Sequence, residues 1–418
     1  MSTNSNVLVV GGGAIGLCTA YYLLQQGVKA TVVDMGEMGQ ACSLHNAGYI
    51  SPSHFVPLAA PGIISQGLKW MLDPVSPFYV KPRLDFEFIS WAWKFRKSCT
   101  PANVERAAPM LRDLGNTSRA LLEEMVKVGG MNFEFTPKGL LVLFRTQRGR
   151  ETQLEEAELA HKLGVGALFL EKSDVQKLAP EITIRADGGL YFPGDCHITP
   201  EKFVADLAQY LKANGVCLVT KTKVTGLKKK GDRITSALTT DGEIQADEFV
   251  IAGGSWSPSI VRPLGIRLLV QAGKGYSVTI QRPDRKPAIP MILSEARVAL
   301  TPMGDTFRVA GTMEIAGLDL AITRRRVQAI LDAVPRYIGG FTPADFHSGE
   351  VWAGLRPVSP DGLPFIGRFT AYPNLIAATG HAMLGITLAP VTGRIVADVV
   401  CGTKPQFEME LLNPDRFR

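Results

Sequence analysis

Residues 6–34 read NVLVVGGGAIGLCTAYYLLQQGVKATVVD, and this stretch decides the fold. Residues 7–10 form a short, apolar, β-branched run, as expected for a strand that is covered on both faces. The run GGGAIG that follows contains the pattern G-x-G-x-x-G. In this pattern Gly11 allows a tight turn, Gly13 allows a pyrophosphate to approach the backbone closely, and Gly16 allows the helix to pack against the strand. The stretch therefore predicts the first half of a dinucleotide-binding βαβ unit.

The positions of charge in this unit indicate which dinucleotide it binds. We expect the phosphates at the N-terminus of the helix, where unpaired N–H groups and the helix dipole attract anions. Asp34 ends the second strand, 18 residues after Gly16, and is placed to accept hydrogen bonds from an adenosine ribose. A carboxylate would repel a 2′-phosphate, so FAD or NAD fits better than NADP.

Length and composition indicate an enzyme of the α/β class. A chain of 418 residues is long for one core, so two intimately joined domains are expected. The hydrophobic content of 46% and the 42 glycines suit a turn-rich α/β protein. The net charge of +6 comes from 45 basic and 39 acidic residues spread along the chain, which does not favour nucleic-acid binding.

The cysteines and the apolar segments indicate a reducing, non-membrane-spanning environment. No CxxC spacing occurs, so neither a disulfide framework nor a metal site is expected. Residues 1–6 lack the features of a secretory signal, and the most apolar segment, residues 56–72, is interrupted by Pro57, Pro61 and Lys69. We therefore expect a cytoplasmic protein with reduced thiols. The cysteines are Cys18, Cys42, Cys99, Cys196, Cys217 and Cys401.

Residues 35–50 are mostly small and polar and cannot build a core of their own. We interpret them as a segment that approaches the cofactor closely, with Ser43 capping a helix whose N-terminus faces the pyrophosphate. An ordinary surface loop is the alternative. Several motifs follow at intervals along the chain: CSLHNAG at 42–48, AAPG at 59–62, KWM at 69–71, KGYS at 274–277, WAGLRP at 352–357 and ATGH at 378–381.

Together with the glycine fingerprint and Asp34, these motifs resemble the FAD-dependent D-amino acid oxidase superfamily, which includes glycine oxidase and sarcosine oxidase. Within it the chain is most similar to the small subunits of bacterial D-amino acid dehydrogenases, nearly end to end. The resemblance implies an α/β fold with a Rossmann-like FAD-binding domain of the GR2, glutathione-reductase-like type. It also implies an inserted α+β substrate domain on a mixed or antiparallel sheet.

The resemblance also implies where the two domains begin and end in the sequence. The FAD-binding domain is expected to be discontinuous, and the substrate domain to carry a helical, aromatic-rich insertion. The FAD-binding domain would comprise residues 1–55, 196–262 and 347–418, and the substrate domain residues 56–195 and 263–346, with 56–97 as the insertion.

The segment 54–97 combines prolines and tryptophans with scattered Lys and Arg, and residues 63–72 and 85–97 are predicted helices. Two interpretations stay open: aromatic packing within the substrate domain, or peripheral contact with the inner face of the plasma membrane, as in respiratory-chain-linked members of the family. Further helices are predicted at 101–128 and at 148–163, the second with glutamates that we expect to be solvated. A strand pattern covers 131–144.

The second half of the chain adds strands at 216–220, 233–239, 243–246 and 271–280. Thr199 is a predicted N-cap for a helix that begins at Pro200. His197 and Tyr276 each have two interpretations: contact with substrate, or a structural position in the fold. In the first, Tyr276 hydrogen-bonds the substrate carboxylate.

The stretch 350–367, EVWAGLRPVSPDGLPFIG, carries the strongest candidate for substrate binding. A guanidinium presents a rigid fork of donors that matches a carboxylate in two parallel bonds. In the superfamily the arginine of this G-L-R-P motif grips the substrate carboxylate, and by that resemblance Arg356 takes the role here. A structural ion pair is the alternative.

Residues 374–390 read as a strand, a glycine loop and the start of a helix that continues to about residue 400. The backbone N–H groups near Gly385 and Ile386 can stabilise negative charge at N1 and O2 of a reduced flavin. His381 is expected to position groups near the flavin ring rather than to act as a base. No cysteine lies in this loop, so FAD is expected to be non-covalent.

The predicted reaction is oxidative deamination of D-amino acids by hydride transfer from Cα to flavin N5, which yields a 2-oxo acid and ammonia. Electrons are expected to pass to a quinone or another non-oxygen acceptor, and apolar substrate side chains are slightly favoured. Alternatives are oxidation of glycine, sarcosine, proline or hydroxyproline, a non-catalytic FAD-binding subunit, or an NAD-dependent dehydrogenase. Candidate catalytic and substrate-binding residues are Arg356, Tyr276, His381, His54 and Tyr49. Candidate cofactor-binding residues are Gly11, Gly13, Ala14, Ile15, Gly16, Asp34, Met35, Cys42, Ser43, His45, Asn46, Ala47, Gly48, Val224, Ala252, Gly253, Gly254, Trp256, Gly380, Met383, Leu384, Gly385, Ile386 and Thr387.

Overall fold

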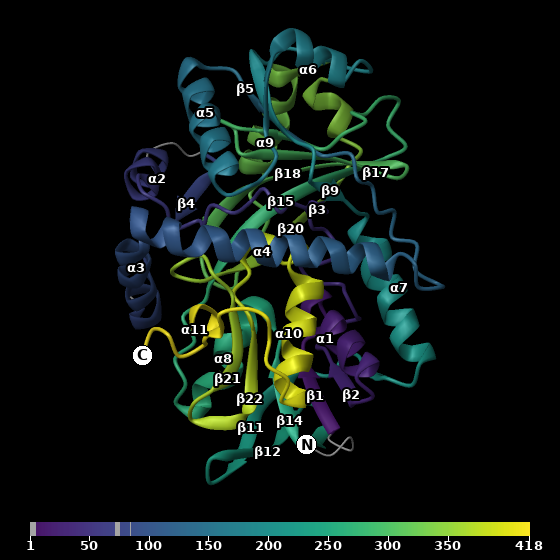
Figure 1. The fold of residues 1–418 in the computed structure, drawn as a ribbon, viewed down its shortest axis with the longest axis vertical. Helices are drawn as coiled ribbons and strands as arrows, with labels where there is room; N and C mark the ends of the chain where they lie inside the picture. Colours follow the sequence, from purple (N-terminus) through teal and green to yellow (C-terminus); the bar gives the residue numbers. More distant parts are fainter. Residues whose placement is uncertain (1–5, 72–75, 84) are drawn as a thin grey trace.

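Two sheets, one in each half of the molecule, organise the fold (Figure 1). The structure is a computed structural model that describes residues 6–71, 76–83 and 85–418. The predicted α/β fold is confirmed. The lower sheet has six strands in the order β10 (Cys217–Val219), β2 (Lys29–Val33), β1 (Asn6–Val10), β14 (Glu248–Ile251), β22 (Tyr372–Thr379) and β21 (Phe365–Phe369).

Five strands of this sheet are parallel and only the edge strand β21 is antiparallel. Side chains of β1 alternate between two cores: Val7 and Val9 face the helices, whereas Leu8 and Val10 face a second layer. Burial on both faces explains why β1 is apolar from Val7 to Val10. The second layer is an antiparallel sheet of β11 (Val224–Lys230), β12 (Arg233–Thr239) and β13 (Gly242–Gln245).

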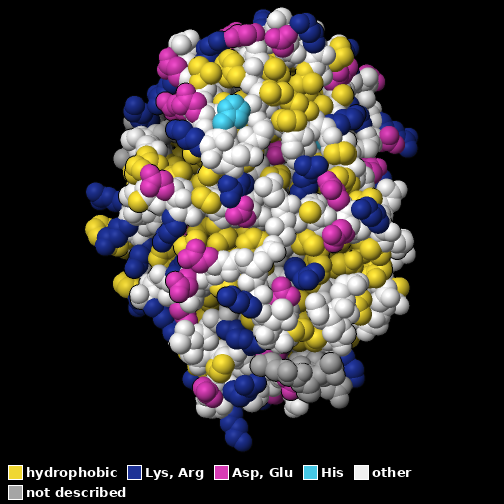
Figure 2. Space-filling view, in the orientation of Figure 1, with side chains coloured by type: hydrophobic (Ala, Val, Ile, Leu, Met, Phe, Trp, Pro, Cys, Tyr) yellow, Lys and Arg dark blue, Asp and Glu magenta, His cyan; other side chains and the backbone are white. Residues whose placement is uncertain are grey.

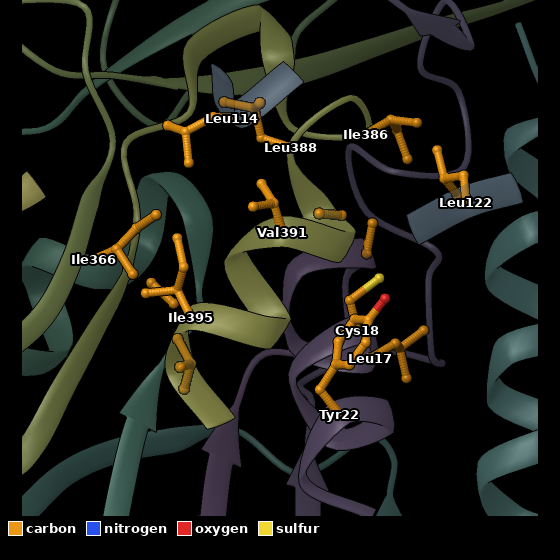
Figure 3. Close-up of a cluster of buried hydrophobic side chains, with 14 of the residues drawn as sticks. Leu17, Cys18, Tyr22, Leu114, Leu122, Ile366, Ile386, Leu388, Val391 and Ile395 are labelled. Carbon is orange, nitrogen blue, oxygen red and sulfur yellow. The ribbon is translucent and has the colours of Figure 1, made fainter. Parts of the chain in front are cut away.

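Helices α1 (Ala14–Gln25) and α10 (Ala389–Cys401) cover the other face of the six-stranded sheet. Figure 3 shows Leu17 and Cys18 of α1 on the side that faces Val391 of α10. The two helices approach closely because Gly393 has no side chain: a Cβ there would lie 2.5 Å from the Cys18 carbonyl oxygen. Close packing of this kind fixes the position of α1 relative to the sheet.

The upper sheet has nine strands and is mixed. Further helices pack around both sheets. The strands run in the order β20 (Glu350–Val358), β15 (Gln271–Gln281), β18 (Thr306–Ile315), β17 (Val298–Met303), β16 (Met291–Leu293), β5 (Leu140–Phe144), β8 (Gly188–Phe192) and β6 (Leu168–Glu171), with β4 (Phe78–Val80) paired to β18. The remaining helices are α2 (Ile63–Met71), α3 (Phe86–Ser98), α4 (Pro101–Met125), α5 (Gln147–Lys162), α6 (Lys172–Leu178), α7 (Pro200–Ala213), α8 (Ser257–Val261), α9 (Arg324–Tyr337) and α11 (Met409–Leu412).

Most predicted elements are present, with two corrections. The strand pattern over 131–144 gives a strand only at Leu140–Phe144, because the preceding residues form an irregular segment with one bridge at Thr136. Thr199 occupies the N-cap of α7, but its hydroxyl donates to Glu134 instead of capping the helix. For the predicted helix 63–72, α2 covers Ile63–Met71 and Leu72 lies outside the described residues.

Within the part of the chain that the structure describes, no helix has the length and apolar content needed to cross a bilayer.

Candidate active site

A cavity of about 820 Å³ extends from the carboxyl ends of β1, β2 and β14 to the upper sheet. The first end is lined by Gly11, Asp34 and Ala252, and the other by residues of β15, β18 and β20, including Gly275 and Arg356. Ligands of open α/β sheets bind outside the carboxyl ends of the strands, so the first end is the expected nucleotide site. The cavity joins this site to the wall that carries Arg356.

The glycines of the fingerprint bring α1 against β1 and open its N-terminus to the cavity. Gly11 has a φ of +118°, which favours glycine, and its N–H donates to the Val33 carbonyl at 2.8 Å. A Cβ at Gly16 would lie 1.8 Å from the Gly11 carbonyl oxygen, so only glycine lets the helix pack here. Ser43 Oγ accepts a hydrogen bond from Ala14 N–H at 2.9 Å, and the helix that Ser43 caps is therefore α1.

Asp34 faces the same end of the cavity with its carboxylate fixed in place. Its Oδ2 accepts from Gly12 N–H at 2.7 Å and its Oδ1 accepts from Gly36 N–H at 2.8 Å. Each oxygen keeps a further lone pair for a ligand hydroxyl, because a carboxylate has about four acceptor sites.

These features fit an extended dinucleotide. The N-terminus of α1 offers N–H groups to phosphates, and Asp34 offers acceptors to a ribose. At two further positions, Gly254 and Gly385, a Cβ would meet no atom within 4 Å, so both glycines border open space along the cavity. The imidazole Nδ1 of His45 lines it as a buried polar atom without a partner, which a polar ligand would satisfy.

Segment 42–48 is held in place by three strands of the upper sheet, β20, β18 and β17. Cys42 Sγ donates to the Leu355 carbonyl and accepts from Leu355 N–H, both at 3.0 Å. Arg308, only 1% exposed, donates to the Asn46 carbonyl at 2.6 Å, and Thr301 Oγ1 donates to the Ala47 carbonyl at 2.7 Å. The segment is therefore held as part of the cavity wall and is not an ordinary surface loop.

Arg356 lies on β20, opposite Gly273 of β15, and its side chain crosses over Gly275. A Cβ at Gly275 would lie 2.0 Å from Arg356 Nη1, so the glycine makes the space that the guanidinium occupies. Nη1 donates to the Thr312 carbonyl at 2.8 Å, and among the described residues no carboxylate forms an ion pair with Arg356. Burial lowers the pKa of Arg356, yet a guanidinium stays charged in proteins. It therefore presents an uncompensated positive charge to the cavity.

The two candidate tyrosines line the cavity, but their hydroxyl groups bond elsewhere. Tyr276 Oη donates to Glu314 Oε1 at 2.7 Å and accepts from Thr323 N–H at 3.3 Å, on the α9 side of the sheet. Tyr49 Oη donates to the Met291 carbonyl at 2.7 Å. The expected hydrogen bond from Tyr276 to the substrate carboxylate is therefore wrong for this conformation, and Tyr49 can offer only its ring.

The candidate histidines are neutral at physiological pH. Burial lowers the pKa of His54 to about 4 and that of His381 to about 3. His381 shares a hydrogen bond of 2.9 Å with Thr392 Oγ1, which fixes its ring at the start of the loop before α10. Both residues line the cavity, whereas His197 is buried in the β9 strand (Cys196–His197), paired with β3 (Tyr49–Ile50), and is structural.

Most of the residues predicted from the sequence line this one cavity. Three do not, and each of them is a glycine whose missing side chain serves chain packing: Gly16, Gly48 and Gly380. Those that line it are Gly11, Gly13, Ala14, Ile15, Asp34, Met35, Cys42, Ser43, His45, Asn46, Ala47, Tyr49, His54, Val224, Ala252, Gly253, Gly254, Trp256, Tyr276, Arg356, His381, Met383, Leu384, Gly385, Ile386 and Thr387.

Sequence reasoning missed polar residues that line the cavity from α5 and from the turn between β16 and β17. Glu156 belongs to a helix whose glutamates we expected to be solvated, but it is half-buried and lines the cavity beside Gln153. Arg297 follows β16 in a turn that carries no motif. Gln153, Ala157 and Ala160 recur with the helical period of 3.6 residues and mark the buried face of α5. This periodicity is the signal from which the partial burial of Glu156 could be predicted.

Comparison with known proteins agrees with this site. A family model described as FAD dependent oxidoreductase (DAO) matches residues 6–399. A D-amino acid dehydrogenase from Granulibacter bethesdensis is 33% identical over 408 residues, which are 96% of this chain and 97% of the relative. A D-amino acid dehydrogenase from Vibrio atlanticus is 34% identical over 422 residues, covering 98% and 99%.

Among solved structures, glycine oxidase from Geobacillus kaustophilus superposes with a TM-score of 0.78 at 22% identity, over 98% of each chain. L-proline dehydrogenase from P. horikoshii superposes with a TM-score of 0.75 at 20% identity, over 100% of this chain and 98% of the other. At these identities the superpositions show a shared fold.

Proposed function

The chain belongs to the DAO family of FAD-dependent oxidoreductases, its cofactor is FAD, and from this premise we propose that it oxidatively deaminates D-amino acids. The observation that carries the substrate class is Arg356, a half-buried side chain that faces the cavity and has no carboxylate partner among the described residues. A carboxylate of the substrate supplies that partner in two parallel hydrogen bonds. The relatives named D-amino acid dehydrogenase support the D configuration.

When bound, FAD supplies the hydride acceptor that converts the amino acid to an imine, which water hydrolyses to a 2-oxo acid and ammonia. Arg356 holds the substrate carboxylate and so orients Cα, a contribution of position rather than of proton transfer. His54 and His381 stay neutral and contribute shape and hydrogen bonding. The α1 N-terminus and Asp34 hold the pyrophosphate and the ribose, and Gly385 and Ile386 line the cavity.

Two measurements test this proposal. The purified protein is expected to show flavin absorbance bands near roughly 370 and 450 nm, which nicotinamide lacks. Turnover with a panel of D- and L-amino acids, glycine, sarcosine and proline, first with a dye acceptor and then with oxygen, should show the highest kcat/KM for a D-amino acid. A protein with flavin that reduces only with glycine or a secondary amine would exclude the proposal.

We further propose that electrons pass to a quinone at the inner face of the plasma membrane, with α3 as the contact. Its residues Phe86, Ile89 and Trp93 are 65%, 52% and 54% exposed, and Arg96 and Lys97 stand next to Trp93. Figure 2 shows Lys and Arg interspersed with hydrophobic side chains at this edge of the molecule. Exposed aromatic residues with basic neighbours suit an anionic bilayer interface.

Co-sedimentation with vesicles that contain anionic lipid tests the contact. The double variant Ile89→Glu, Trp93→Glu should lose vesicle binding while it keeps dye-linked turnover, because these side chains lie outside the cavity. Variation at the exposed Leu154 of α5, Leu154→Glu, is the matched control and should bind vesicles as before. Equal sedimentation of all three proteins would exclude α3 as the contact.

A further inference from the structure

Where helix α5 and the turn between β16 and β17 line the cavity, charged and polar side chains stand among apolar ones and have no role yet in the proposed function. Helix α5 contributes Gln153 and Glu156, and the turn between β16 and β17 contributes Ser294 and Arg297. An apolar substrate side chain would leave these groups without partners. These groups therefore do not favour the apolar substrate side chains that the sequence slightly favours.

Two acceptors in this part of the cavity are available to a ligand. Gln153 is 2% exposed; its Nε2 donates to Ser294 Oγ at 3.4 Å, and its Oε1 is buried with no hydrogen-bond partner among the residues that the structure describes. Glu156, one turn away, lines the cavity, and burial raises the pKa of its carboxyl group. A buried acceptor without a donor is unfavourable, so a donor on the ligand is favoured there.

One cation faces these acceptors. Arg297 has a φ of +54°, a left-handed conformation that costs a non-glycine residue energy and that persists where the surroundings impose it. Its positive charge opposes the rise in the pKa of Glu156 and contributes to the low pKa of His54, so the guanidinium is within electrostatic reach of both. Within the described ranges, neither Arg297 nor Glu156 belongs to an ion pair. Each keeps hydrogen-bonding capacity for a ligand.

We propose that Gln153, Glu156 and Arg297 form a subsite for the substrate side chain, and that this subsite selects amino acids with a hydroxyl group. The inference rests on the proposed function and extends it to the substrate side chain. A hydroxyl donates to the acceptors of α5 and accepts from Arg297, so it satisfies both signs of charge. An ammonium or a carboxylate side chain would be attracted by one of these two charges and repelled by the other, so neither matches both sides of the subsite as a neutral hydroxyl does.

Matched pairs of substrates test the subsite, because each pair differs only by the hydroxyl group: D-serine against D-alanine, D-threonine against D-2-aminobutyrate, and 4-hydroxy-D-proline against D-proline. We expect kcat/KM to favour the hydroxyl member by at least about 10-fold in one or more pairs, since sites built to hydrogen-bond a hydroxyl reject analogues without it. D-glutamate and D-lysine should both be poorer than the best hydroxyl substrate.

Two variants and one control complete the test. In Glu156→Leu the preference within the best pair should fall to about 1, and Arg297→Asn should reduce it while the left-handed backbone is tolerated by asparagine. Glu158→Leu, an exposed position of the same helix outside the cavity, should keep the wild-type ratio. The ratio within a pair does not change if a variant merely folds less well.

The possible outcomes distinguish a failure of the subsite proposal from a failure of the proposed function. D-amino acid turnover with a preference for the apolar members, or an unchanged ratio in Glu156→Leu, overturns the subsite and leaves the proposed function standing. A flavin-containing protein that turns over no D-amino acid overturns both.

Discussion

The position of the Arg356 guanidinium depends on the absence of a neighbouring side chain as much as on its hydrogen-bond partner. Arg356 occupies the volume that a side chain at position 275 would fill, and Gly275 supplies that volume. The G-L-R-P motif identified the arginine, but the glycine opposite it could be found only from strand register, which pairs Gly273 with Arg356. A pairing across β15 and β20 is not encoded in local sequence.

Replacement of Arg356 by lysine tests the role of its planar fork. Arg356→Lys should raise KM for the substrate by roughly 10- to 100-fold and leave the flavin spectrum intact, because a point charge replaces two parallel hydrogen bonds. Steady-state kinetics and the absorbance spectrum measure the two effects. Arg267→Lys, which lies outside the cavity, is the control; unchanged kinetics in Arg356→Lys would remove the arginine from substrate binding.

A buried carboxyl group, that of Asp195, predicts how stability depends on pH. Ser53 donates to its carboxyl group through N–H at 3.2 Å and through the hydroxyl at 2.5 Å, and burial is the main cause that raises the pKa of Asp195 to about 7. The unfolded chain loses this proton near pH 3.9. The native state therefore holds a proton that the unfolded state has lost, and the resulting stabilisation disappears as pH rises toward 7.

The variant Asp195→Asn removes this titration. The difference in melting temperature between wild type and variant should change steadily between pH 4.5 and 7.5, with wild type losing more stability as pH rises. Thermal unfolding at several pH values measures it. Two curves that run parallel over this range would show that Asp195 does not titrate with the expected pKa.

At the scale of elements, regular periodicity made the helices and the βαβ unit predictable, whereas irregular segments were not. Helices α4 and α5 lie within a few residues of their predicted bounds because their apolar faces repeat. The strand predicted over 131–144 is confirmed only at Leu140–Phe144, since residues of an alternating pattern form no more than a single bridge when no partner strand is in register. The expected domain boundaries stay a prediction.

The contact between α1 and β1 supports a prediction about Gly16. Gly16→Ala places a Cβ where the Gly11 carbonyl oxygen now lies, so α1 must shift, at a cost of about 1–3 kcal/mol or more. The shift moves the N–H groups that face the phosphates. We expect a lower melting temperature and less FAD per polypeptide, measured by absorbance after desalting.

Gly166→Ala is the matched control for this substitution. The nearest atom to a Cβ at Gly166 would be Pro193 Cγ at 3.8 Å, which is ordinary contact. This variant should keep its FAD content and its melting temperature. A Gly16→Ala protein with full FAD content would show that α1 tolerates the displacement.

At the scale of the whole molecule, the cavity is shared by both sheets, and so is any ligand that fills it. The nucleotide end belongs to β1, β2 and β14, while segment 42–48 is bonded to β18 through Arg308 and to β20 through Cys42. The sequence predicted both ends separately. Their continuity depends on hydrogen bonds between residues more than 250 positions apart, which no local pattern reveals.

A ligand that contacts both sheets should stabilise the molecule as one unit. Binding to the native state alone adds about 2.7 kcal/mol at a free ligand concentration of 100 Kd. The melting temperature should therefore rise with added FAD and fall after its removal.

Asp34→Ala deletes the acceptors that we assign to the ribose, so this variant should retain less FAD and show a smaller rise in melting temperature at the same FAD concentration. Glu37→Ala is the control, because Glu37 lies three residues after Asp34 and outside the cavity lining. Its melting temperature should rise with FAD as that of the wild type does. If Asp34→Ala and wild type gained equal stability at every FAD concentration, the ribose would bind elsewhere, and the nucleotide end of the cavity would need to be reassigned.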